Sequence, residues 1–155
     1  MYNHEPKNYI CPFCQIVKGE PTDRGDQERS VVLRGALATA FISAKWWKLN
    51  PGHVIIVPNK HYENIYDLDD EAGHAVFDLS KKISIALKEA YKCDGVSLRQ
   101  HNEPDGNQDV WHYHLHVFPR YAGDNLYANH EETSWRTEEE KEVYAKKLKA
   151  LLNGN

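Results

Sequence analysis

The sequence predicts an α+β domain built on an antiparallel sheet, and three features of the chain support this fold class. Short runs rich in β-branched and aromatic residues are joined by tight turns, which favours antiparallel pairing. Apolar side chains recur at helical spacing over residues 72–90, which predicts one long helix after the central strand. An amphipathic segment at about residues 137–152 predicts a C-terminal helix. We expect a single domain over residues 1–155, a length that can bury its own core.

Three strands are expected in the first part of the chain, after a short helical or turn segment at residues 11–17. A loop should follow at residues 19–26, which begin with Gly19-Glu20-Pro21. The strands are expected at residues 30–33, 36–42 and 53–57, with a turn at Arg34-Gly35 and a loop at residues 43–52. The third run is almost continuously apolar, which is consistent with a central position in the sheet.

The long helix should begin near residues 67–70, where acidic side chains suit the N-terminal end of the helix dipole, and stop at Cys93-Asp94-Gly95. A strand at residues 96–101 and a turn at residues 102–108 follow. The last helix is expected to begin at Thr137, with Glu140 completing a capping box. It should bury three apolar side chains, Val143, Leu148 and Leu151.

Three histidines alternate with apolar residues in the run from Trp111 to Phe118, and this is the most specific feature of the sequence. In an extended chain His112, His114 and His116 would share one face, about 6.5–7 Å apart. Their β-branched and aromatic neighbours favour a strand over a helix. Three imidazoles on one face add little to a core, so this face is a candidate functional site.

The chemistry of imidazole leaves three interpretations of this face. In the first, a neutral imidazole attacks phosphorus, and His114 is the candidate nucleophile because it alone has an imidazole on both sides. In the second, the three histidines hold a catalytic zinc ion, although side chains on a flat strand diverge too far for all three to reach one ion. In the third, the face is polar and has no function.

Composition excludes several classes of protein. A net charge of −4 and a pI near 6.1 argue against a protein that binds nucleic-acid backbones. Residues 1–10 lack the apolar region of a signal peptide, and no apolar stretch approaches the ~20 residues of a membrane span, so a cytoplasmic protein without membrane contact is expected. Three cysteines do not build a disulfide framework, and Cys93 is expected to be a small buried hydrophobe.

The histidine run resembles the signature of the histidine-triad superfamily, in which three histidines alternate with apolar residues and two apolar residues follow. Two further blocks are similar to the same family, Cys11-Pro12-Phe13-Cys14-Gln15-Ile16-Val17 and Pro51-Gly52-His53-Val54-Ile55-Ile56-Val57-Pro58-Asn59-Lys60-His61. The spacing of the three blocks also fits, so the resemblance covers about residues 10–122. The C-terminal helix lies outside it.

This resemblance implies a fold, a reaction and a partner. The fold would be the histidine-triad α+β fold, usually a homodimer in which the two sheets join across the interface. The ligand would be a purine nucleotide conjugate, and His114 would attack its α-phosphorus to form a nucleotidyl-histidine. His116 would bond the phosphoryl oxygens, and His53 would lie close to the same centre.

The resemblance also implies a structural zinc ion, because some bacterial members bind zinc through a cysteine pair and two histidines. In this chain these positions are Cys11, Cys14, His61 and His112. Such a Cys2His2 set would be closed and tetrahedral, hence structural. The alternative is four neighbouring residues without a metal. No organic cofactor is expected.

The resemblance places a nucleoside pocket around three apolar side chains, Phe13, Ile16 and Phe41, which suit a flat base. Family members often bond the ribose hydroxyls with Asp or Asn. That position falls on Ser43 when counted from Phe41, and on Lys45 when counted back from the central strand. The loop residues Lys45-Trp46-Trp47-Lys48 could stack a second base, or one ring could cover the core and the other a dimer interface.

Asn102 and Gln108 match polar positions that hold phosphates in the family, whereas Asp109 departs from its usual Ser or Thr. A carboxylate ~4 Å from a phosphate charge repels it by about 4 kcal/mol at an effective dielectric of 20. Asp109 therefore points elsewhere, is protonated, or faces a leaving group that is not a polyphosphate, such as an amine. It could equally be a strand-entry residue that bonds the turn backbone.

Three functions remain open from the sequence. The first is an enzyme that acts through His114 on phosphoramidates or dinucleoside polyphosphates, by hydrolysis or phosphorolysis. The second is a nucleotide-binding or regulatory module with little turnover. The third is a zinc-dependent hydrolase in which the triad itself holds the metal.

Overall fold

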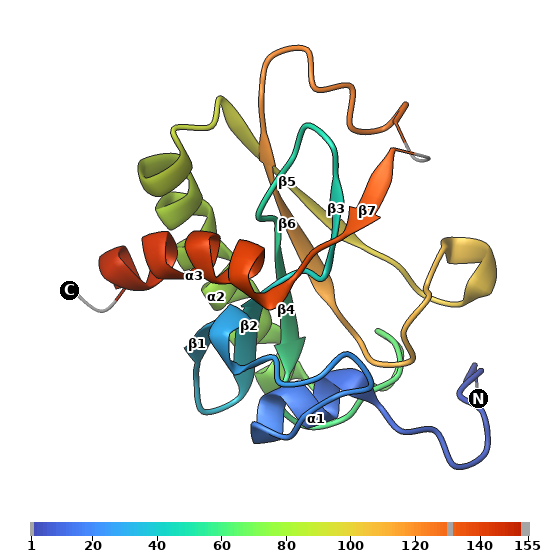
Figure 1. Cartoon of the computed structure of the whole chain (residues 1–155). Helices are drawn as coiled ribbons and strands as arrows, with labels where there is room; N and C mark the ends of the chain where they lie inside the picture. Colours follow the sequence, from blue (N-terminus) through green and yellow to red (C-terminus); the bar gives the residue numbers. More distant parts are fainter. Residues whose placement is uncertain (1, 130–131, 153–155) are drawn as a thin grey trace.

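The computed structural model describes residues 2–129 and 132–152 and contains a five-stranded antiparallel sheet (Figure 1). The order of the strands is β1-β2-β4-β6-β5, and every neighbouring pair is antiparallel. Their bounds are Val31–Arg34 for β1, Ala38–Ile42 for β2, Val54–Pro58 for β4, Gly95–Gln100 for β5 and Leu115–Arg120 for β6. The predicted α+β class is confirmed, and the strand at residues 53–57 occupies the predicted central position.

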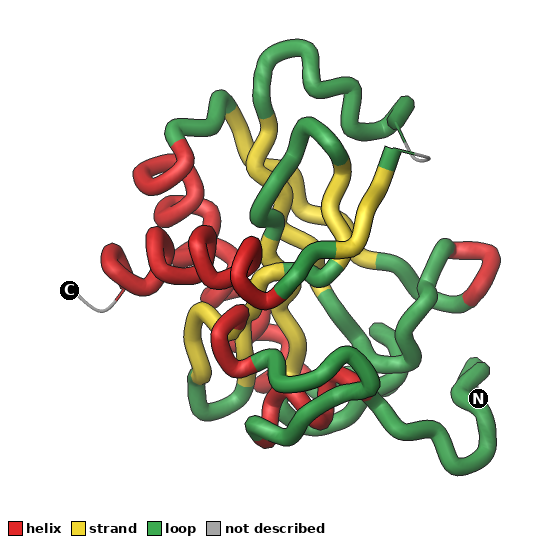
Figure 2. The backbone as a smooth tube through the Cα atoms, viewed as in Figure 1, coloured by secondary structure: helices red, strands yellow, loops and turns green. Residues whose placement is uncertain are grey.

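Helices α2 (Asp70–Tyr91) and α3 (Glu138–Leu152) lie on one side of the sheet, where Figure 2 shows them in red beside the yellow strands. Alternation along the strands builds this packing, because Val54 and Ile56 of β4 face the helices while Ile55 faces the other side. On that other side the short helix α1 (Pro12–Lys18) covers β2 and β4 through Phe13 and Ile16. Two 3-10 turns, η1 (Glu28–Ser30) and η2 (Pro104–Gly106), complete the helical elements among the described residues.

The histidine run is only partly a strand, which corrects the prediction. Strand β6 begins at Leu115 and continues through Pro119, so His112 and His114 precede it. The backbone N–H of Tyr113 donates to the carbonyl of Tyr62 at 2.6 Å rather than to a neighbouring strand. The chain therefore approaches the sheet as a loop, and its three imidazoles do not have to share one face.

A second, two-stranded sheet stands where a loop was expected. Strand β3 (Lys45–Trp47) pairs antiparallel with β7 (Thr133–Trp135), and the two lie side by side in Figure 1. Trp46 is buried against Tyr144 of α3, with ring centroids 4.9 Å apart. This confirms the interpretation that one tryptophan of the pair covers the core.

The C-terminal helix forms as predicted, but Val143 is not part of its buried face. Thr137 and Glu140 make the reciprocal hydrogen bonds of a capping box, at 3.3 and 2.9 Å. Val143 is 54% exposed, whereas Ala145 and Leu148 are buried and Leu151 is half-buried. At 100° per residue, Val143 lies roughly opposite Ala145, so the buried stripe cannot include both.

Cys93 is buried, as expected for a small hydrophobe. Within residues 2–129 and 132–152, no helix combines the length and apolar character needed to cross a bilayer.

Candidate active site and metal centre

His114 is a buried imidazole whose tautomer is set by its own backbone. Its Nδ1 donates to the carbonyl oxygen of His112 at 2.7 Å. Because Nδ1 carries the proton, Nε2 keeps its lone pair. The ring lies against Phe13 of α1 at a centroid distance of 5.3 Å and against His116 at 4.9 Å. The bond to the backbone therefore presents a potential nucleophile in a fixed orientation.

His116 and His53 form a second pair beside His114. Nδ1 of His116 lies 3.3 Å from Nε2 of His53, and the His53 ring stacks on Phe118 at 4.3 Å. Strand β6 supplies His116, and His53 directly precedes β4, its neighbour in the sheet. The sheet thus brings together the three residues that the sequence assigned to catalysis.

Burial keeps all three imidazoles neutral. Desolvation lowers the pKa of His114, and it lowers the pKa of His116 well below its ordinary value, with the neighbouring histidines adding to the effect. The pKa of His53 falls to about 3, through burial first and the charge of Arg99 second. The site therefore contains no imidazolium near neutral pH, and its ring N–H groups are neutral donors.

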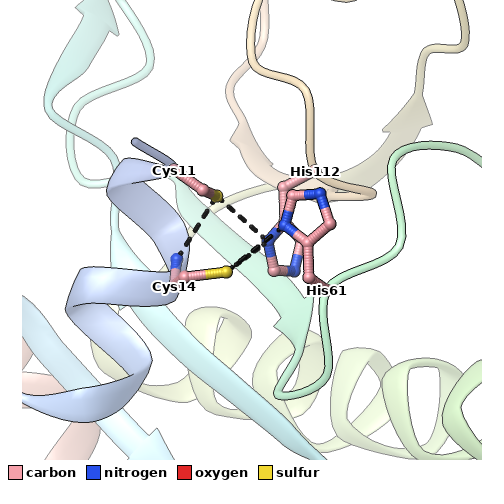
Figure 3. Close-up of side chains that lie close together, drawn as sticks. All are labelled: Cys11, Cys14, His61 and His112. Carbon is pink, nitrogen blue, oxygen red and sulfur yellow. Dashed lines mark hydrogen bonds between the residues drawn. The ribbon is translucent and has the colours of Figure 1, made fainter. Parts of the chain in front are cut away.

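His112 belongs to a different cluster, shown in Figure 3, in which Cys11 and Cys14 of the α1 region meet His61 and His112. Nδ1 of His112 lies 3.3 Å from Sγ of Cys11 and 3.5 Å from Sγ of Cys14. Nδ1 of His61 lies 3.3 Å from Sγ of Cys14. All four potential ligand atoms lie within 4.8 Å of one another.

The protonation states of this cluster suit zinc. Hydrogen bonds from Cys11 and the two histidines lower the pKa of the Cys14 thiol and favour the thiolate, which is the form that binds metals. Both histidines place Nε2 against an outer acceptor, Glu5 at 2.9 Å for His61 and the carbonyl of Pro58 at 3.0 Å for His112. Each Nδ1 is therefore free to coordinate a metal, as expected of histidine ligands with an outer hydrogen-bond partner. The four residues fit a closed Cys2His2 zinc site.

A cavity of about 370 Å³ opens beside the catalytic histidines. It is lined by all three of them and by the side chains assigned to the base, Phe13, Ile16 and Phe41, with Ser43, Lys45 and Asp109. This size suits a ligand as large as a nucleotide. The hydroxyl of Ser43 already bonds the backbone of Lys45, donating to its carbonyl at 3.1 Å.

The sequence and the fold of the chain are similar to those of known proteins. Residues 24–123 match the sequence model of one protein family, the HIT domain. The chain belongs to the HIT family. Protein hit of Bacillus subtilis is 31% identical over 117 residues, which is 75% of each chain. Adenosine 5'-monophosphoramidase hnt1 of Schizosaccharomyces pombe is 28% identical over 110 residues, 71% of this chain and 74% of that protein.

Several solved structures superpose over most of the chain. A Hit-like protein of Bartonella henselae has a TM-score of 0.77 at 28% identity and covers 96% of this chain and 98% of its own. A Zn-bound histidine triad protein of Mycobacterium smegmatis has a TM-score of 0.71 at 23% identity, covering 94% and 97%. Diadenosine triphosphate hydrolase of Plasmodium falciparum has a TM-score of 0.72 at 19% identity, covering 100% and 90%. The last two likenesses concern the fold.

Two polar residues of this HIT domain do not line the cavity, although the resemblance placed them near phosphate. The side-chain amide of Gln108 is buried, accepts from the backbone N–H of Glu103 at 2.8 Å and donates to the carbonyl of Glu63 at 2.6 Å. Asn102 accepts from the backbone N–H of Ile65 at 2.9 Å. Both amides shape the loop between β5 and β6 in this structure, and their contact with phosphate stays a prediction.

The HIT-domain cavity also has walls that sequence reasoning missed. Residues 22–24 and Gln27, from the loop after α1, border it, as do Trp47, Thr133 and Trp135 of the small sheet. The guanidinium of Arg24 stacks on the ring of Trp135 at 3.5 Å from its centroid. The tryptophan pair between lysines was the only local signal for this region. Nothing near Trp135 in the sequence indicates its pairing with Lys45.

Proposed function

We propose that this HIT protein is a nucleotide phosphohydrolase or nucleotidyltransferase that acts at the α-phosphate of a purine nucleotide conjugate. The observation that carries the proposal is the neutral, backbone-oriented imidazole of His114 at the wall of a nucleotide-sized cavity. A neutral Nε2 with a fixed lone pair needs no general base to become a nucleophile.

The placement of the three histidines supports a two-step reaction. Nε2 of His114 forms a bond to the α-phosphorus, and the bond from phosphorus to the leaving group breaks, so the leaving group departs with its electron pair and takes up a proton from solvent. Water then attacks the same phosphorus and loses a proton to solvent, the bond between phosphorus and Nε2 of His114 breaks, and nucleoside monophosphate is released. His116 would donate a hydrogen bond to a phosphoryl oxygen while His53 holds the ring of His116, at 3.3 Å.

The apolar part of the cavity supports a purine as the nucleoside base. Phe13 and Phe41 lie 5.3 Å apart at one wall, and Ile16 and Ile55 add aliphatic surface. The relative from S. pombe is named a phosphoramidase and the structural neighbour from P. falciparum a diadenosine triphosphate hydrolase. Both of these activities release a leaving group from a nucleotide, and we include both kinds of substrate in the proposal.

We infer that Cys11, Cys14, His61 and His112 hold a structural zinc ion. The M. smegmatis neighbour is described as Zn-bound, and the four donor atoms here lie within 4.8 Å of one another. Zinc in a closed four-ligand set supplies a crosslink rather than a reacting group. Through His112 the crosslink would fix the carbonyl that orients His114. The third interpretation, a metal held by the triad, is not favoured, because the metal-type cluster found among the described residues includes only His112 of the three.

We also propose a homodimer joined along β5. This strand lies at the edge of the sheet, and its Leu98 is 43% exposed. An unpaired edge with apolar side chains favours pairing with a second copy. Light scattering after size-exclusion chromatography, with Leu98→Lys as the variant, tests this.

The test of the enzymatic proposal is a covalent adduct on His114. Protein mixed with adenosine and guanosine phosphoramidates, or with the corresponding dinucleoside polyphosphates, is quenched with denaturant and weighed by mass spectrometry. We expect a gain of one nucleotidyl group, lost in His114→Ala and retained in His74→Ala, an exposed control on α2. Nucleotide binding without an adduct or turnover would favour a regulatory binding module instead. Full turnover by His114→Ala would overturn the proposal.

A further inference from the structure

We propose that Arg24 selects the base of the substrate and makes this site prefer guanine over adenine nucleotides. The inference rests on the proposed function, which leaves the base open. It concerns a part of the cavity that the proposed reaction does not use, namely the loop at residues 22–27 and the small sheet β3–β7.

The first step is the direction in which the cavity runs. At the start of α1, the ring of Phe13 lies 5.3 Å from that of His114. The helix ends at Lys18, and the chain then enters the loop at residues 22–27, which borders the same cavity. A seven-residue helix is about 10 Å long. The end of α1 from which the chain continues to this loop is therefore about 10 Å from the end that carries Phe13.

The small sheet gives the same direction independently. Trp47 pairs with Thr133, and its ring lies 5.8 Å from that of His53, near the catalytic histidines. Lys45 pairs with Trp135, two residues further along both strands, or about 7 Å away. Trp135 and the guanidinium stacked on it thus lie where the base of a nucleotide would reach when its α-phosphate is at His114.

The backbone of Arg24 is held in a closed turn. The turn that carries it closes through two backbone hydrogen bonds of 2.9 Å between Thr22 and Gly25. Gln27 donates to the carbonyl of Arg24 at 3.2 Å and itself accepts from the buried ammonium of Lys141 at 2.6 Å. Within residues 2–129 and 132–152 the Arg24 side chain makes no hydrogen bond or ion pair, and its guanidinium carbon lies 3.5 Å from the centroid of the Trp135 ring. Among these described residues, no group occupies the N–H edge of this exposed guanidinium.

The chemistry of that edge selects the base. A guanidinium offers only donors, in a planar fork, and the fork matches the adjacent O6 and N7 acceptors of guanine. Adenine presents an amino group in place of O6, which would oppose a second donor. Asp23 also lines the cavity, and its carboxylate could accept from the N1–H and N2–H groups of guanine. An arginine beside an aspartate complements the guanine edge.

The experiment compares guanosine and adenosine 5'-phosphoramidates, which share the reacting group and differ only in the base. We expect wild-type kcat/KM to favour guanosine by about tenfold or more. Arg24→Met should reduce that preference to about twofold, mainly by lowering the guanosine value. Arg24→Lys should also lose most of it, because an ammonium cannot make the planar fork. Arg29→Met removes an exposed arginine outside the cavity and should change neither value.

Binding keeps this inference separable from the proposed reaction. GMP and AMP are titrated into the His114→Ala protein with and without Arg24→Met, and thermal unfolding confirms that each variant is folded. Tighter binding of GMP that depends on Arg24 supports base selection, whether or not any substrate turns over. A lack of turnover would count against the proposed reaction and not against the role of Arg24. Equal affinities, a preference for adenine, or an equal loss for both bases in Arg24→Met would overturn the role of Arg24.

Discussion

The carbonyl oxygen of His112 lies 2.7 Å from Nδ1 of His114, while the imidazole of His112 faces the thiols of Cys11 and Cys14. One residue thus belongs to the metal cluster through its side chain and to the nucleophile through its backbone. A disturbance of the cluster can move the carbonyl that sets the tautomer of His114. Stability and catalysis are therefore expected to be linked at this residue.

Glu5 is expected to strengthen zinc binding, because its carboxylate lies 2.9 Å from Nε2 of His61 and orients that ring. Glu5→Gln should weaken zinc affinity by roughly 10–100-fold, the usual effect of losing an outer partner of a metal ligand. Competition with a fluorescent zinc chelator measures this. Glu89→Gln, an exposed glutamate on α2, is the matched control. Unchanged affinity in Glu5→Gln would mean that the ion pair does not position His61.

Activity should persist into mildly acidic solution. Burial lowers the pKa of His114, so the nucleophile stays unprotonated below pH 6.5, where a free histidine would be half charged. The acid limb of kcat/KM that belongs to His114 should therefore lie below that pH. A pH profile between 4.5 and 8 on an uncharged-leaving-group substrate records it. An acid limb centred at or above pH 6.5 would contradict the role of burial.

Stability should decrease as the pH falls below 6.5. The unfolded chain binds a proton at His53 near that value, whereas burial lowers the folded-state pKa of His53 to about 3. Between these values the unfolded state holds the extra proton, at a cost of about 1.4 kcal/mol per pH unit for this group. Urea unfolding at pH 7, 6 and 5 measures the slope. His53→Gln should flatten it, and an unchanged slope would assign the effect to other groups.

Gly52 should not tolerate a side chain. Its φ is +72°, and an added Cβ would collide with the ring of Tyr144 on α3. Gly52→Ala is expected to lower the free energy of unfolding by about 1–3 kcal/mol, the range for overpacking and backbone strain. Gly106→Ala is the control, because no atom lies within 4 Å of the position of its Cβ. Equal denaturation midpoints for the two variants would show that the loop before β4 can shift.

Asp109 is expected to discriminate between leaving groups. It lines the cavity, and its charge acts to raise the pKa of His114 against the effect of burial. Asp109→Ser should increase kcat/KM for a dinucleoside polyphosphate by about tenfold, because repulsion of the anionic leaving group is removed. It should decrease kcat/KM for a phosphoramidate by about tenfold, because the carboxylate that favours a leaving amine is lost. Steady-state kinetics on both substrates decides. Equal effects on the two would leave Asp109 as a residue that only shapes the turn.

Residue patterns were sufficient to predict the elements whose structure depends on local periodicity and capping. The apolar run of β4, the long helix α2 and the capping box of α3 all lie within two or three residues of their predicted places. Periodicity failed at Val143, because the phase of a helix with mixed polarity is set by what it packs on. Lys141 lies on the buried face of α3, and its ammonium donates a hydrogen bond to Gln27, a contact that no local pattern indicates.

The sequence by itself determined which side chains could do chemistry, since three alternating histidines and a cysteine pair carry that information in their spacing. The family resemblance implied how they divide, and only the tertiary structure provides the contacts that divide them. It assigned His112 to the cysteines 98 and 101 positions away and left His114 and His116 to the cavity. It also brought Trp135 beside Lys45 and Arg24. Contacts between distant segments depend on how the sheet closes around the core, and residue spacing along the chain does not encode that.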